Sequence, residues 1–262
     1  MRRIKILSAI LIGCTILSTA NVEASELIVS NNSNITKNVE SDIKFFETSP
    51  EIIELMKKRI ENGEVASITN TTTFNESRIT LSSGMAKVLS AAGFDHSAYL
   101  LDYSMWPLRE EPKEIYADSV MASHIWTYSP DFENVVRAFL NEAKSKGSYQ
   151  YFKTTSMIFQ MPTEGKLEIL GNEKLKIRTD LFGALKKVKI NLGVVKNKGA
   201  WTIDVIIEDT YDFSNEKYTG FVDLVNNIAY YEQELGKIKP YDIYIYAGRA
   251  NMLRLPFGVS SW

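Results

Sequence analysis

Two carboxylates and a phenol stand close together where one predicted strand ends. Residues 201–220 begin as an alternating strand and then present Asp209, Tyr211 and Asp212. Oxygen ligands of this kind can hold a hard divalent cation, with water completing its coordination. A carboxyl that faces inward can instead have a raised pKa and act as a general base. These three residues are therefore our candidate catalytic residues. No cofactor is predicted for them, and the identity of any metal stays open.

The alternation of this strand indicates which way its side chains face. The odd positions from 201 to 207 are all apolar, so Asp209 and Tyr211 fall on the buried face if the strand continues. Asp212 then points the other way or enters the turn. A structural interpretation accounts for the same residues, because acidic side chains at strand ends commonly accept hydrogen bonds from nearby backbone N–H groups. The sequence leaves both interpretations open.

The histidines and tyrosines offer weaker signals. His96 and His124 are the only histidines, and their wide separation matches no metal-binding spacing. A nucleophile elbow, a phosphate-binding loop, a zinc-protease helix and a dinucleotide-binding glycine pattern are all missing from the sequence. Tyr244 and Tyr246 share one face of a predicted strand. Such tyrosines either bind sugars or protein partners, or pack under a helix with the hydroxyl at the rim.

The N-terminus is typical of an export signal. Arg2, Arg3 and Lys5 precede an apolar run, and small residues stand where a signal peptidase would cut after Ala24. We expect residues 1–24 to be removed and the mature chain to be secreted or periplasmic. The alternative is a lipid anchor at Cys14, because residues 11–14 resemble a bacterial lipobox, although the apolar run continues beyond this cysteine.

Composition limits the classes of function. The 262 residues are 45% apolar and 24% charged, with a formal net charge of −2, so no electrostatic argument for nucleic-acid binding exists. No apolar run is long enough to span a membrane, so we expect no transmembrane segment in the mature chain. Cys14 is the only cysteine. The mature chain would therefore have neither a disulfide nor a cysteine nucleophile if the signal is cleaved.

The period of the apolar residues changes from helical to strand-like near residue 148. Residues 25–44 are polar and predict a flexible leader, and residues 45–262 predict a single α+β domain. Its first part, 45–147, is helical, and 148–262 is β-rich, with a strand also expected over 64–74. We expect an antiparallel sheet with one inserted helix at about 220–235. Two short segments, "KLEIL" and "KLKI", are further strand candidates.

Two stretches together resemble a bacterial module found at the C-terminal ends of polymorphic-toxin-type proteins. They are "FDHSAYLLDYSM" in the helical part and "WTIDVIIEDTYDF" with the "FVDLVNNIAYYEQELGKIKPYDIYI" that follows. The resemblance implies an exported α+β domain. It implies little about chemistry. The export signal, the cysteine-free mature chain and the absence of a complete catalytic set lead us to expect that the domain acts by interaction with a protein or cell-envelope partner.

A second, partial resemblance concerns the candidate residues themselves. The segment 209–212 matches the first half of the motif of the colicin M family, Asp-x-Tyr-Asp followed five residues later by His-Arg. That resemblance implies a divalent-cation-dependent hydrolase that cleaves a lipid-linked cell-envelope precursor. Here Tyr218 and Thr219 stand where the family has the pair that would shuttle a proton and face the phosphate. His124 or Arg249 could replace this pair in space.

Overall fold

The computed structural model describes residues 43–65, 81–105, 113–116, 119–163, 169, 171–214 and 220–260, without the side chains of 81–83 and 220–225. The predicted signal, Cys14, and nearly all of the leader, of the 64–74 strand and of "KLEIL" lie outside these residues. The helices are α2 (Pro50–Glu61), α3 (Leu81–Ala91), α4 (Asp95–Ser104), α5 (Val120–Tyr128), α6 (Pro130–Lys146), α8 (Glu173–Leu185), α9 (Gly220–Glu234) and the short 3₁₀ turn η2 (Pro256–Gly258).

Helix boundaries follow the capping residues that the sequence supplies. The hydroxyl of Ser49 accepts a hydrogen bond from the N–H of Ile52 at the start of α2. Ser129 does the same for the N–H of Phe132 at the start of α6, and Gly147 ends that helix in the left-handed conformation. Both helices lie in the part of the chain, 45–147, that the sequence predicts to be helical. Within the described residues, no helix has both the length and the apolar character that crossing a membrane would require.

Six strands form one mixed sheet. They are β1 (Lys113–Ile115), β2 (Gln150–Ile158), β3 (Lys187–Asn197), β4 (Ala200–Tyr211), β5 (Tyr241–Tyr246) and β6 (Arg249–Met252). Their order is β1-β5-β4-β3-β2, and β6 pairs with β4 beyond the end of β5. The α+β class is confirmed, with helices mainly in the first half and strands mainly in the second.

Two details of the predicted sheet were wrong. The sheet is not wholly antiparallel, because β1 pairs with β5 in parallel. The "KLKI" segment lies in α8, so α8 and α9 are both inserted among the strands. Asn172 caps α8 by accepting from the N–H of Leu175, and Leu175 and Ile177 are buried together with later helical positions such as Leu181. A four-residue window is too short to distinguish this pattern from a strand.

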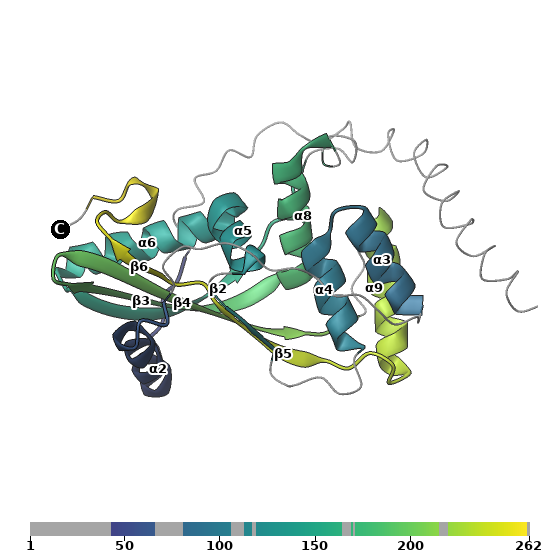
Figure 1. The fold of residues 1–262 in the computed structure, drawn as a ribbon, viewed down its shortest axis with the longest axis horizontal. Coiled ribbons are helices and arrows are strands. Elements are labelled where there is room, and N and C mark those ends of the chain that lie inside the picture. The colour runs from purple at the N-terminus through teal and green to yellow at the C-terminus, as the bar shows by residue number, and fades with distance from the viewer. Residues whose placement is uncertain are drawn as a thin grey trace, which may run out of the picture.

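The sheet is covered unequally on its two faces (Figure 1). Helices α5, α6 and α8 cover one face, α2 lies on the other, and α3, α4 and α9 gather at one end. The main core fills the space between the sheet and α5, α6 and α8, with the buried odd positions of β4 among its members. A smaller apolar cluster joins α3, α4 and α9, and Phe213 packs against both clusters.

Gly248 provides a test of the packing where β5 leads into β6. A Cβ at this position would stand 2.6 Å from Oδ1 of Asp204, 2.6 Å from Val65 and 3.0 Å from the carbonyl oxygen of Ile203. We expect Gly248→Ala to lower the free energy of unfolding by about 1–3 kcal/mol, because backbone limits the relaxation. The matched control is Gly84→Ala in α3, where nothing lies within 4 Å. This change should stabilise the protein by up to about 1 kcal/mol. Urea unfolding of both variants measures the difference, and equal effects would contradict the packing described.

Candidate functional site

The strand end predicted from the sequence lies at the last residues of β4. Asp209 and Tyr211 are on the face of the main core, as the alternation predicted, whereas Asp212 is exposed. Tyr211 is buried, and its ring lies 5.1 Å from that of Phe213 and 5.3 Å from that of Tyr241 between centroids. The three residues are close in the sequence, but the structure places them in different surroundings.

Asp209 is partly buried, and its carboxylate accepts one hydrogen bond, from the N–H of Thr210 at 2.9 Å. Burial raises the pKa of Asp209 to about 8, opposed by this N–H and reinforced by the charge of Asp212. Burial also raises the pKa of Tyr211 well above its usual value. Asp209 is thus a carboxyl that can exchange a proton near neutral pH. Tyr211 is a neutral phenol whose ring completes the core.

A cation or phosphate site at Asp209 would need further ligands or a cationic side chain beside its carboxylate. The described residues contain no group of three or more His, Cys, Asp or Glu side chains that could hold a metal ion. Arg249 belongs to β6 and pairs with Ile203 of β4, towards the end of β4 opposite to Asp209. Its guanidinium carbon lies 4.3 Å from the ring centroid of Trp126. His124 contacts His96 instead of the strand end. Neither side chain therefore replaces the missing His-Arg pair at Asp209.

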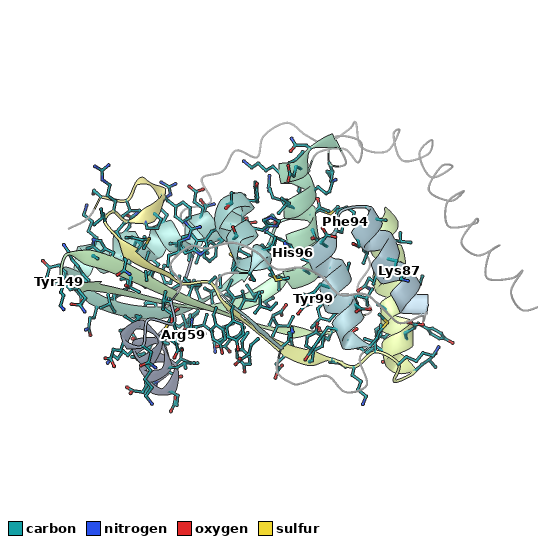
Figure 2. All side chains as sticks on the ribbon, viewed as in Figure 1. Arg59, Lys87, Phe94, His96, Tyr99 and Tyr149 are labelled. Atoms are coloured by element: carbon teal, nitrogen blue, oxygen red, sulfur yellow. The ribbon has the colours of Figure 1, made fainter. Side chains whose placement is uncertain are left out.

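The two histidines are brought together although they are far apart in the sequence. Nε2 of His96 and Nδ1 of His124 are 2.9 Å apart, so the two rings share one hydrogen bond. The rings are nearly perpendicular, with centroids 5.0 Å apart, and the ring of Tyr128 meets His124 edge-on. His96 lies where α4 approaches α5 and α8 (Figure 2). No spacing in the sequence could have indicated this pair.

Asp180 of α8 holds the α4 side of this junction. The residue before α4, Phe94, has no side chain able to cap the helix. Asp180 supplies the cap from outside, because its two carboxylate oxygens accept from the N–H groups of His96 at 2.7 Å and Ser97 at 2.8 Å. The hydroxyl of Ser97 also donates to the carbonyl of Asp180 at 3.1 Å. Three helices thus meet through Asp180, His96 and His124.

Burial controls the protonation of this junction. It lowers the pKa of His96 to about 4, against the opposing charge of Asp95, and it also lowers the pKa of His124. Burial raises the pKa of Asp180 to about 6, although its hydrogen bonds to Ser97 and His96 oppose the rise. Both imidazoles are therefore neutral at neutral pH. One ring donates the shared proton, and the other accepts it.

A second polar arrangement lies on the opposite face of the sheet, under α2. Nε of Arg59 donates to Oδ2 of Asp204 at 3.1 Å, and the two residues are 5% and 0% exposed. The guanidinium carbon stands 4.1 Å from the centroid of Tyr246. The Nη2 atom of Arg59 is buried and has no hydrogen-bond partner among the described residues. Figure 2 shows Arg59 at the junction of α2 with the sheet.

Beside Arg59, two tyrosines and a glutamate form what we call the tyrosine patch, comprising Glu114, Tyr116 and Tyr246. The hydroxyl of Tyr116 donates to Oε2 of Glu114 at 2.7 Å, and that of Tyr246 donates to Oε1 at 3.1 Å. The two rings stack, with centroids 5.9 Å apart and an angle of 26° between their planes. Tyr116 is 57% exposed. The hydrogen bond to Glu114 raises the pKa of Tyr116, and burial followed by the same carboxylate raises that of Tyr246 to about 12.

The sequence interpretation of the tyrosines was only partly informative. Tyr244 and Tyr246 do share a face, and both are partly buried. Tyr116 directly follows β1, a three-residue strand that the sequence pattern did not reveal. Comparison with known protein families, with curated proteins and with solved structures found no match to this chain.

Proposed function

We propose that this protein is an exported bacterial interaction module, related to toxin-type proteins, that binds a protein or cell-envelope partner through the tyrosine patch. Export rests on the signal-like residues 1–24 of the sequence. The observation that carries the binding proposal is the exposed ring of Tyr116, which is held in place by the carboxylate of Glu114 and the ring of Tyr246.

Several physical features favour binding at this patch. Tyrosine and arginine are the residue types most often responsible for binding energy at protein interfaces. The guanidinium of Arg59 packs on the ring of Tyr246 and restrains it, and Arg59 is itself held by its hydrogen bond to Asp204. A ring that is ordered before binding loses little conformational entropy when a partner covers it. Tyr116 therefore offers a partner a large surface that is already in position.

Co-sedimentation with isolated bacterial cell envelopes tests the proposal. We expect the purified protein to co-sediment and Tyr116→Ala to weaken binding at least about tenfold, a typical loss for a central aromatic contact. Tyr116→Phe is the matched control, since it retains the stacked ring but loses the hydrogen bond to Glu114. Its affinity should lie between those of the parent protein and Tyr116→Ala. Tyr231→Ala removes another exposed tyrosine, 63% accessible, and should bind normally. Equal binding by Tyr116→Ala and the parent protein would contradict the proposal.

A second candidate function is a divalent-cation-dependent hydrolase of a cell-envelope substrate, with Asp209, Tyr211 and Asp212 at its centre. The observation in its favour is the pKa of Asp209, which burial raises to about 8 and which suits a general base. Hydrolysis of bis(p-nitrophenyl) phosphate with and without Mg²⁺ distinguishes this candidate. Cation-dependent turnover that disappears in Asp209→Asn while Tyr116→Ala retains it would favour the hydrolase over the binding module.

A further inference from the structure

The contact between His96 and His124 is the place where α4 meets α5, and it depends on the number of protons it holds. Two imidazole nitrogens 2.9 Å apart require one proton between them. A neutral pair satisfies this requirement, because one ring donates and the other accepts. A pair with one added proton also satisfies it, with the extra proton on an outer nitrogen. When both rings are protonated, two N–H groups face each other and the bond is lost.

The surroundings make the doubly protonated state costly. His96 is only 6% exposed, so a charge there loses most of its hydration. It is also the second residue of α4, where the helix dipole disfavours a positive charge. His124 is partly exposed and can take the first proton more easily. The second proton would place two positive rings in contact at a buried junction, which favours separation of the helices.

The charged groups around the pair are few among the described residues. Asp95 of α4 favours protonation of both rings, and Asp180 and Glu173 of α8 favour protonation of His124. The neighbour within α5 is the aromatic ring of Tyr128, which meets the ring of His124 edge-on. Asp180 is already engaged by the N–H groups of His96 and Ser97, so its carboxylate is not free to pair with an imidazolium. The acids therefore moderate the effect without cancelling it.

We propose that the histidine pair is an acid-sensitive latch, which closes α5 onto α4 when neutral and releases it when both rings are protonated. The rest of α5 stays attached in the acid form, because Ile125 and Trp126 lie in the main core and the indole N–H of Trp126 donates to the carbonyl of Ala247. The opening is thus local. It alters the surface formed by α4 and α5 and leaves the sheet intact.

The direction of the pH effect follows from the pKa values. An unfolded histidine titrates near 6.5, whereas burial lowers the pKa of His96 in the folded protein to about 4. The contribution of the pair to the stability of the folded state is therefore complete above about pH 6.5, and it is lost as the pH falls from about 6.5 to about 4. Asp180 acts in the opposite sense, since its raised pKa favours the folded state as the pH falls below about 6. Because the parent protein and the histidine variants all contain Asp180, comparing them at the same pH removes the contribution of Asp180.

The sequence allows a clean experiment, because the chain has two histidines and no others. Imidazole NMR signals of the whole protein between pH 7.5 and 3.5 should show two coupled titrations, one of them clearly below pH 6. Amide hydrogen exchange should show protection of α4 and α5 falling over the same range while β3 and β4 stay protected. His124→Gln keeps a polar partner for His96 but cannot be charged, so its loss of protection should move to lower pH by about one unit or more.

His96→Gln is the reciprocal variant and should shift the transition in the same direction. Independent titration of both histidines near pH 6.5, with unchanged protection of α4 and α5 at pH 4, would overturn the proposal. An acid response in both glutamine variants equal to that of the parent protein would overturn it as well. If neither variant folds, the titration and exchange of the unaltered protein decide the question alone.

Discussion

Replacing Arg59 with methionine is expected to lower the free energy of unfolding by about 3–5 kcal/mol, the usual cost of leaving one partner of a buried ion pair alone. Asp204 is wholly buried, and Arg59 is the only cation that contacts its carboxylate among the described residues. Without it, the carboxylate retains one hydrogen bond, from the N–H of Val205 at 3.1 Å. Urea unfolding of the two proteins at pH 7.5 measures the loss.

The matched control lies at the preceding position. Lys58 belongs to the same helix, but its side chain is 66% exposed and stands 4.0 Å from Glu54. Lys58→Met should change the stability by less than about 0.5 kcal/mol, as is usual for a surface pair. Equal effects of Arg59→Met and Lys58→Met would show that the buried pair contributes nothing, and they would contradict the prediction.

The double variant separates the pair from its surroundings. Removing both charges, in Arg59→Met with Asp204→Leu, leaves no buried ion and should cost less than the sum of the single changes. The pH dependence provides an independent check. Burial raises the pKa of Asp204 and the charge of Arg59 opposes part of this rise, so Arg59→Met should let this carboxyl keep a proton to higher pH. The loss of stability should therefore be smaller at pH 5 than at pH 8, because a protonated Asp204 carries no unpaired charge.

The ion pair also shows a limit of the alternating pattern. Alternation predicts that a segment is a strand, but it does not predict which other elements cover the faces of that strand. Asp204 occupies an even position of β4, and the sequence pattern assigns that face to solvent. In the structure, α2 lies on this face, and Arg59 of α2 contacts the buried Asp204. Asn191 of β3, which pairs with the even position 206 of β4, is buried as well. Where a helix from an earlier part of the chain will lie is a property of tertiary packing. A local pattern contains no information about it.

Local signals were sufficient where a single segment determines the outcome. The caps at Ser49, Ser129 and Gly147 and the inward face of Asp209 and Tyr211 all follow from neighbouring residues. The parallel strand β1 was not predicted, because three residues are too few to show a period. The meeting of His96, His124 and Asp180 was not predicted either, because each comes from a different helix.

The second large expected effect concerns Asp209, whose carboxyl tests the strand-end site directly. Burial raises the pKa of Asp209 to about 8 in the folded protein, whereas an unfolded aspartate has a pKa near 3.8. Between these values the folded state holds a proton that the unfolded state has released, so stability falls as the pH rises from about 4 to about 8. Asp209→Asn cannot ionise. It should therefore be more stable than the parent protein at pH 9, by about 2 kcal/mol or more, and differ little at pH 4.

Urea unfolding at both pH values measures this difference, and Asp212→Asn serves as the control, because Asp212 is exposed and neighbours Asp209 closely in the chain. The control should change the stability little at either pH, apart from relieving a repulsion that itself raises the pKa of Asp209. A gain in Asp209→Asn at pH 9 means that the native site holds its carboxylate at a cost, with Thr210 N–H as its hydrogen-bond donor among the described residues. A loss of stability at pH 9 would instead mean that a cation or an additional donor stabilises the ionised carboxylate, and it would remove the raised pKa on which the general-base candidate rests. The sign of this difference thus tests whether burial raises the pKa of Asp209, and the Mg²⁺-dependent hydrolysis assay then separates the structural interpretation of this strand end from the catalytic one.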